Sequence, residues 1–287
     1  MKISIIKPDS VNVDPWVPAF RDRKIEVCEN FVEPDCDVIL CASHSQISKL
    51  AYYHKLYPTI PIINYNWDLY GWVFTNPRGY DWATYGEFLK ISDQIWCPSE
   101  EVVLRTEEFF GVGDRCRIVK TFARFFDHDD VCDKRYILNP MRGYASDKNM
   151  GWLRKACTEL NIPLVESGHK LTEEQFKRTV AHCTFMCTEY EEASTGGLTL
   201  LEGFRLGKPV VVSDSIYMGA RDYFGDHAIY FNNESYEDFK QTIKNTWENT
   251  PTLSLELCRK ITDQYTLDNM VDEMHKNLKQ LLRSRKR

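Results

Sequence analysis

The sequence predicts an α/β protein of two domains, each built on a parallel β-sheet with helices on both faces. The chain has 287 residues, about twice the length of a typical domain. Short runs rich in Ile and Val alternate with segments of helical periodicity, which is the pattern of repeated strand–helix units. A polar stretch without a clear period, residues 124–135, separates two such sets. We therefore expect a first domain over residues 1–125, a second over 130–265 and a last helix over 266–287.

In the first set, continuous apolar runs such as "DVILCAS" indicate strands that are buried on both faces. The predicted strands are residues 2–7, 24–29, 37–43, 60–66, 93–99 and 115–123. A rough apolar stripe predicts a helix over 45–56. A second helix follows at 100–110, with Ser99 as its N-cap.

The second set repeats the alternation. Its predicted strands are residues 135–140, 162–167, 183–188, 209–214 and 228–232. A helix over 146–160 is predicted, with Ser146 or Asp147 as its cap. A second over 172–181 begins with a Thr172–Gln175 capping box, and a third over 236–247 follows Ser235 as its cap. A long amphipathic helix ends the chain, and its expected buried face is Leu267, Met270, Val271, Met274, Leu278 and Leu281.

Composition narrows the class of protein. The net charge of −6 argues against a protein that coats nucleic acid, and no apolar run is long enough for a membrane span or a signal peptide. Ten scattered cysteines without a CxxC pair favour a reduced, cytoplasmic protein with buried thiols. Cys183 and Cys187 are expected in the core rather than on zinc. We expect no metal, and we interpret the acidic run 127–130 as a linker.

One segment, "STGGLTLLEGFRLGKPVVVSD" (194–214), combines glycines and a carboxylate around a predicted helix. It follows the strand 183–188, and parallel sheets bind ligands beyond the carboxyl ends of their strands. Gly196 and Gly197 would let a diphosphate approach the N–H groups of a helix that begins near Gly196. Glu202, about one and a half turns further, could accept hydrogen bonds from ribose hydroxyls. From these residues alone, an equally good interpretation is that the glycines allow close packing and that Glu202 extends to solvent.

This segment resembles the donor-nucleotide motif of GT-B glycosyltransferases, most closely the retaining enzymes of family 4. The matching positions are Gly197, Leu198, Leu201, Glu202, Gly207, Pro209, Val210, Val211, Ser213 and Asp214. The resemblance extends to "RGYASDKN" and "DQIWCPSEEVVLRTEEFFGV", so it covers the second domain well and the first thinly. It implies two Rossmann-like domains with parallel sheets facing a central cleft. Residues 1–125 would form a reduced acceptor side, 130–265 the donor side, and 266–287 a helix that crosses back to the first domain.

The resemblance also assigns the site. Arg142 and Lys148 would bind the donor phosphates, although their spacing is one residue longer than in the family. The full set of implied donor-binding residues is Arg142, Lys148, Glu192, Ser194, Thr195, Gly196, Gly197, Leu198 and Glu202. The family's first motif glutamate falls at Ser194 here, so Glu191 or Glu192 would substitute for it. Two cations and a helix N-terminus can stabilise the leaving diphosphate without a metal or cofactor.

The sugar-facing histidine of the family is missing, because the chain has Asn66, Trp67 and Asp68 at that point. Asp68 and His44 are the catalytic candidates, with a turn-capping aspartate and a structural histidine as the alternatives.

The expected function is metal-independent hexosyl or pentosyl transfer, with retention, from a nucleotide-diphosphate sugar to an acceptor glycan. A UDP-sugar is the expected donor, and no stable membrane insertion is expected.

Two alternatives stay open. One is a phage-type enzyme that acts on a modified DNA base. The basic residues Arg21, Arg23 and Lys24, the tail "RSRKR" and the aromatic loop 65–82 would suit it, because an extruded base stacks on aromatic rings. The net negative charge of the chain counts against it. A non-catalytic nucleotide-sugar-binding module would explain the missing histidine.

Overall fold

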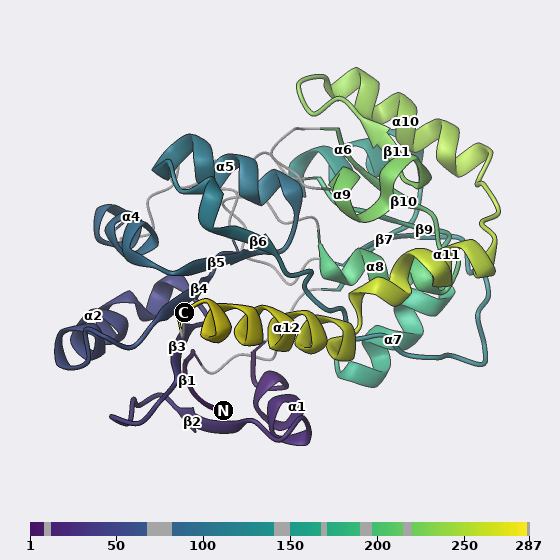
Figure 1. Cartoon of the computed structure of the whole chain (residues 1–287). Coiled ribbons are helices and arrows are strands. Elements are labelled where there is room, and N and C mark those ends of the chain that lie inside the picture. Colours follow the sequence, from purple (N-terminus) through teal and green to yellow (C-terminus); the bar gives the residue numbers. More distant parts are fainter. Residues whose placement is uncertain are drawn as a thin grey trace. The chain divides into compact units, whose positions relative to one another are not determined.

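The computed structural model describes residues 1–8, 13–67, 82–140, 150–167, 171–189, 197–214 and 220–285. The chain divides into two compact units (Figure 1). Unit 1 comprises Met1–Asp68, Pro77–Phe122 and Tyr265–Arg287. Unit 2 comprises Leu69–Asn76 and Ala123–Gln264.

Unit 1 contains a six-stranded parallel sheet with the strand order β2-β1-β3-β4-β5-β6. In register, Ile5 of β1 lies opposite Leu40 of β3, and Ile39 of β3 lies opposite Ile62 of β4. The residues of β3, β4 and β5 are all buried, as expected for parallel strands covered on both faces. The strands are β1 (Lys2–Ile6), β2 (Glu26–Glu29), β3 (Val38–Cys41), β4 (Ile62–Tyr65), β5 (Gln94–Cys97) and β6 (Cys116–Ile118).

The helices of unit 1 include two that the sequence patterns do not predict, α1 and α4. Helix α1 has only seven residues and no capping side chain, so it carries little periodic signal. The prediction for α5 is confirmed, because the Ser99 hydroxyl accepts a hydrogen bond from the Val102 N–H. The helical elements are α1 (Trp16–Asp22), η1 (His44–Gln46), α2 (Ile47–Leu56), α4 (Trp82–Ile91), α5 (Glu100–Phe110), η2 (Gly113–Arg115) and α12 (Leu267–Arg285).

Helix α12 belongs to unit 1, where it packs along α1. Its apolar face is as predicted, with Leu267 partly buried and Met270, Val271, Met274, Leu278 and Leu281 buried in the core of unit 1. Polar contacts fix both ends of the helix. Arg23 contacts Asp268 at 3.1 Å and Asp272 at 2.6 Å, while Arg285 donates to Asp93 at 2.9 Å.

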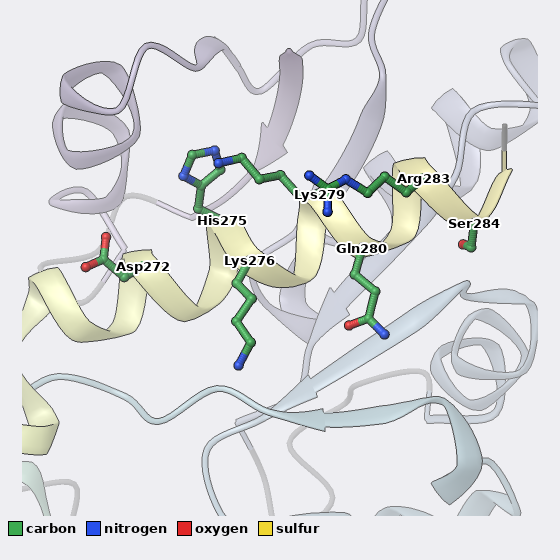
Figure 2. A pocket seen from close by; sticks show the side chains of 7 residues that line it. All are labelled: Asp272, His275, Lys276, Lys279, Gln280, Arg283 and Ser284. Atoms are coloured by element: carbon green, nitrogen blue, oxygen red, sulfur yellow. The ribbon is translucent and has the colours of Figure 1, made fainter.

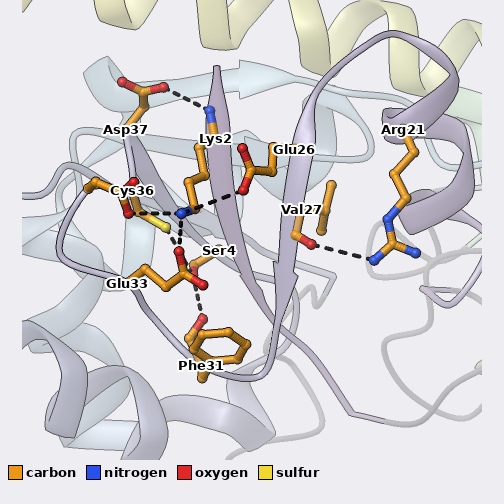
Figure 3. Close-up of polar contacts among 10 residues, drawn as sticks. Lys2, Ser4, Arg21, Glu26, Val27, Phe31, Glu33, Cys36 and Asp37 are labelled. Carbon is orange, nitrogen blue, oxygen red and sulfur yellow. Dashed lines mark hydrogen bonds and ion pairs between the residues drawn. The ribbon is translucent and has the colours of Figure 1, made fainter.

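An ion cluster fastens the start of β1 to the chain that follows β2 (Figure 3). The Lys2 ammonium contacts Glu33, Asp35 at 2.9 Å and Glu26 at 3.5 Å. Hydrogen bonds to Glu33 and Asp35 raise the pKa of Lys2 above its ordinary value. The Lys2 backbone N–H donates to Asp37 at 2.8 Å, so polar contacts hold the amino end of β1 against the segment between β2 and β3.

Unit 2 contains a five-stranded parallel sheet with the strand order β11-β10-β9-β7-β8. The capping box of α7 is confirmed by reciprocal hydrogen bonds between Thr172 and Gln175, and Ser235 caps α10 as predicted. The predicted caps Ser146 and Asp147 lie outside the described residues. The strands are β7 (Ile137–Asn139), β8 (Leu164–Glu166), β9 (Phe185–Cys187), β10 (Val210–Ser213) and β11 (Ile229–Phe231). The helical elements are α6 (Met150–Leu160), α7 (Glu173–His182), α8 (Leu198–Arg205), α9 (Ala220–Phe224), η4 (Gly225–His227), α10 (Tyr236–Glu248), α11 (Leu255–Thr262) and η5 (Asp263–Tyr265).

All ten cysteines are free thiols, and nine of them are buried. Cys183 and Cys187 lie in the core of unit 2, as predicted. Among the helices in the described part of the chain, none combines the length and apolar character that crossing a bilayer requires.

Candidate functional site

The strand order of unit 2 places a topological switch point between β7 and β9. The chain runs from β7 outward to β8 on one side, and from β9 outward to β10 and β11 on the other. Ligands of open parallel sheets bind at such a point, beyond the carboxyl ends of the strands. Residues 141–149, which follow β7 in the sequence, and 190–196, which follow β9, lie outside the described residues.

Most predicted site residues fall in segments outside the described residues. These are Asp68, Arg142, Lys148, Glu192, Ser194, Thr195 and Gly196. His44 begins η1, directly beyond β3, and its side chain is also outside the description. Gly197, Leu198 and Glu202 are described, and they all belong to α8 and its cap.

Helix α8 begins at Leu198, slightly later than predicted, and its N-cap is Gly197. Gly197 has φ 70° and ψ 84°, a left-handed conformation that favours glycine. Gly197 has no side chain to accept from the first turn, whereas the caps of α5, α7, α10 and α11 are serine or threonine hydroxyls that do so. The first N–H groups of a helix have no partner within it, so the N-terminus of α8 is suited to an anion.

Glu202 lies at the boundary between the core and the surface. Its neighbours Leu201 and Gly203 are buried, whereas its own side chain is half-buried. Glu202 and Leu198 are four residues apart, so they share a face of α8. The carboxylate therefore lies on the same side of the helix as the glycine-capped turn.

The opposite face of α8 packs closely on β9. A Cβ at Gly203 would lie 1.9 Å from Met186 Sδ and 3.2 Å from Val180 Cγ1. The close approach of Met186 explains why this position has glycine, because a side chain here would overlap the sulfur. The contact fixes the distance between the helix and the strand end that precedes the predicted site.

Glu189, which the sequence patterns missed, lies at the same edge. It follows β9 and is 3% exposed. Its Oε2 accepts a hydrogen bond of 2.8 Å from the Leu153 N–H in the first turn of α6. Burial raises the pKa of Glu189 to about 8, and hydrogen bonds from the Leu153 and Trp152 N–H groups only partly oppose that effect. The first-turn donors of α6 are thus occupied by this carboxyl group.

Three polar side-chain atoms at this edge are buried without a hydrogen-bond partner: Glu189 Oε1, Thr188 Oγ1 and Ser167 Oγ. They follow β9 and β8, the strands on either side of β7. Unpaired buried polar atoms are costly, and their concentration at a strand edge is typical of a site that binds a polar ligand. The only sequence signal for them is a Thr–Glu pair directly after a buried strand.

Asn66 and Trp67, which stand where the resemblance would place a sugar-facing histidine, are held by hydrogen bonds. Asn66 is buried and donates to Thr106 Oγ1 at 2.7 Å. Trp67 donates from Nε1 to the Ala42 carbonyl at 2.7 Å, and its ring stacks on Trp16. Both side chains are therefore held within unit 1, whereas Asp68 lies outside the described residues.

A buried lysine occupies the corresponding edge of the unit 1 sheet. Lys7 follows β1, at the switch point between β1 and β3, and is 6% exposed. Its ammonium contacts Asp14 at 2.5 Å and Glu29 at 3.6 Å. The pairing explains how this cation is tolerated in a buried position.

A separate cavity of about 720 Å³ lies along α12 (Figure 2). His275, Lys279 and Arg283 extend to one side of the helix, and Lys276 and Gln280 to the other. Burial, together with the charges of Lys279 and Arg23, lowers the pKa of His275. Of the predicted site residues that the structure describes, Gly197, Leu198 and Glu202, none lines this cavity.

The fold of the chain is the GT-B fold of glycosyltransferases, as predicted, with one parallel sheet in each unit. Sucrose-phosphate synthase from Thermosynechococcus elongatus matches with a TM-score of 0.80 and 10% identity, over 99% of this chain and 100% of that one. HepE from Anabaena, in complex with UDP-glucose, matches with a TM-score of 0.71 and 11% identity, over 98% and 100% of the two chains. A glycosyltransferase from Rickettsia africae matches with a TM-score of 0.69 and 12% identity, over 98% of each chain. No protein-family model and no curated sequence matches the chain.

Proposed function

We propose that the protein is a glycosyltransferase that moves a hexose or pentose from a nucleotide-diphosphate sugar to an acceptor, with retention of configuration. The observation that carries this proposal is α8. A glycine-capped helix follows β9 at the switch point, with a half-buried glutamate on the face of its first turn. The GT-B fold supports the same conclusion, and a UDP-sugar is the proposed donor because the similar Anabaena HepE binds UDP-glucose.

In this proposal unit 2 holds the donor. The N–H groups of Gly197 and Leu198 face the diphosphate, and Glu202 accepts hydrogen bonds from the ribose hydroxyls. Arg142 and Lys148, which follow β7 in the sequence, bind the phosphates. The donor site is completed by residues that follow β9 in the sequence: Glu192, Ser194, Thr195 and Gly196. The unpaired hydroxyl of Thr188 and the Glu189 carboxyl group extend this polar edge.

Transfer breaks the bond between the anomeric carbon and the diphosphate oxygen, and the electron pair leaves with the nucleotide. The acceptor oxygen bonds to the same carbon and loses its proton. Arg142 and Lys148 stabilise the charge that grows on the diphosphate, so the reaction needs no metal ion. Unit 1 supplies the acceptor side, where Asp68 or His44 stabilises the sugar cation or accepts the proton.

The test is calorimetry with UDP, followed by a transfer and hydrolysis assay with a panel of UDP-sugars. Glu202→Ala should weaken UDP binding about ten- to a hundredfold, because losing a hydrogen bond to a charged group costs roughly 1.5–3 kcal/mol. Glu248→Ala, on an exposed position of α10, is the matched control and should bind as wild type. Equal UDP affinity in all three proteins would show that Glu202 is not part of the site. If no UDP-sugar is turned over, the protein is a binding module and not an enzyme for these donors.

A further inference from the structure

We propose that Asp130, Cys132 and His182 form a site for one transition-metal ion in unit 2, with Zn²⁺ as its metal. One ligand atom from each residue lies within 4.8 Å of the other two. Tetrahedral zinc holds N, O and S ligands at about 2.0–2.3 Å, which corresponds to ligand separations of roughly 3.3–3.8 Å. Small side-chain movements therefore suffice to close the set around an ion.

The backbone already holds the two halves of the site together. The Cys132 N–H donates to the Ala181 carbonyl at 3.3 Å, and the Lys134 N–H donates to the His182 carbonyl at 2.9 Å. The Thr184 hydroxyl donates to Asp133 at 2.6 Å. These bonds do not involve the proposed ligand atoms, so the segment 130–134 stays beside the end of α7 without a metal.

The imidazole of His182 is 3% exposed, and its Nε2 lies 3.1 Å from Asp130 Oδ2 and 2.9 Å from the Asp130 carbonyl oxygen. Both partners are acceptors, so Nε2 carries the proton in the metal-free protein. On metal binding, this proton moves to Nδ1 and the neutral ring coordinates through Nε2.

Cys132 is the one cysteine of ten that is not buried, so its thiol can reach an incoming ion. The ammonium of Lys208 donates to the Cys132 and Cys183 carbonyls, at 2.9 Å each, and so holds the backbone at Cys132 in place. Binding releases the thiol proton to solvent. One thiolate and one carboxylate then neutralise the two charges of the ion.

The surroundings supply an entry path and a neighbouring imidazole. The ring of His128 packs edge-on against that of His182, with centroids 5.6 Å apart. His128 and Asp129 line a cavity of about 670 Å³. The segment that carries Asp130 and Cys132 thus borders this cavity, from which a water molecule would complete the coordination of the ion.

The position of the site in unit 2 indicates a structural role for the ion. His182 precedes β9, so the ion would lie at the amino edge of the unit 2 sheet, whereas the proposed donor site lies at the carboxyl edge. The ion would link the segment at the start of unit 2 to the end of α7. His182 lies 52 residues from Asp130 in the sequence, so the acidic run 127–130 gives no local signal of this site.

Co²⁺ is the probe for the test, because its thiolate complexes have a charge-transfer band that zinc complexes lack. Chelator-treated full-length protein is titrated with Co²⁺ and then with Zn²⁺. We expect a thiolate-to-cobalt band that saturates at one ion per chain and disappears when Zn²⁺ displaces Co²⁺. Cys132→Ser should abolish the band, and Asp130→Asn should weaken Co²⁺ binding at least about tenfold.

Asp129→Asn, which changes the adjacent carboxylate outside the set, is the matched control and should bind Co²⁺ as wild type. Zn²⁺ should also raise the melting temperature of wild type and Asp129→Asn, but not of Cys132→Ser. Because Cys132 is not buried, its serine variant should remain folded, which circular dichroism checks. A cobalt band that survives in Cys132→Ser, or no band in wild type, would overturn the proposal.

Discussion

The buried carboxyl group of Glu189 should make the stability of the protein fall as the pH rises. Its pKa is about 8 in the folded protein, against an ordinary value of 4.5. The folded state therefore holds the proton over a pH range in which the unfolded chain has released it. A raised pKa contributes stability that is complete below about pH 4.5 and is lost as the pH rises through about 8.

Replacing Glu189 by glutamine isolates this effect, because the amide has the shape of the protonated acid and keeps an oxygen for the Leu153 N–H. Linkage predicts that the free energy of unfolding of wild type falls by at most about 3 kcal/mol between pH 5.5 and pH 8. The glutamine variant should not show this fall. Urea unfolding of both proteins at the two pH values measures the difference.

Glu248→Gln, on an exposed position of α10, is the control and should follow wild type. If the stabilities of wild type and Glu189→Gln change in parallel from pH 5.5 to pH 8, Glu189 is already ionised in the folded protein. The carboxyl group would then have a charged partner at the strand edge, and the reasoning from its burial would be wrong.

Two further predictions concern packing and catalysis. Gly203→Ala should destabilise the protein by about 1–3 kcal/mol, because its Cβ would overlap Met186 Sδ. In thermal unfolding, the same substitution should cost less in a Met186→Ala background, and additive costs of the two substitutions would contradict the contact. Arg142→Ala and Lys148→Ala should each lower kcat more than UDP-sugar affinity, because they stabilise charge that grows in the transition state. Wild-type turnover in both variants would place the phosphate-binding groups elsewhere.

The elements that the sequence predicts well are those with local signals. Ser99 and the Thr172–Gln175 box give the starts of α5 and α7, and the apolar face of α12 follows from a spacing that needs no knowledge of its partner. Helices α1 and α4 lack such signals, since α1 spans seven residues without a capping side chain and α4 follows an aromatic segment rich in turn residues.

The site shows the same division. The glycine cap of α8 and the position of Glu202 follow from a motif that is contiguous in sequence. The burial of Glu189 depends on the first turn of α6, 36 residues away, and the neighbours of His182 come from a segment 52 residues away. Neither environment could be predicted from local patterns, because both arise only when separate elements pack together.

The catalytic role of Asp68 can be tested against the structure around it. Asn66 and Trp67 are anchored in unit 1 by hydrogen bonds to Thr106 and to the Ala42 carbonyl, and Asp68 follows them directly in the sequence. A carboxylate there could stabilise the sugar cation or accept the acceptor's proton. Asp68→Asn should then lower kcat by roughly two or more orders of magnitude.

UDP affinity should not change in this variant, because the proposed donor site belongs to unit 2. The measurement is turnover per folded molecule, with the folded fraction taken from circular dichroism, beside His44→Ala treated in the same way. A turn-capping Asp68 would instead give a less stable variant with an unchanged rate. If Asp68→Asn keeps its rate while His44→Ala loses it, the catalytic group is at the end of β3, where His44 begins η1. If both variants turn over at the wild-type rate, neither residue takes part in the reaction, and the protein stabilises the sugar cation with groups from outside these two strand ends.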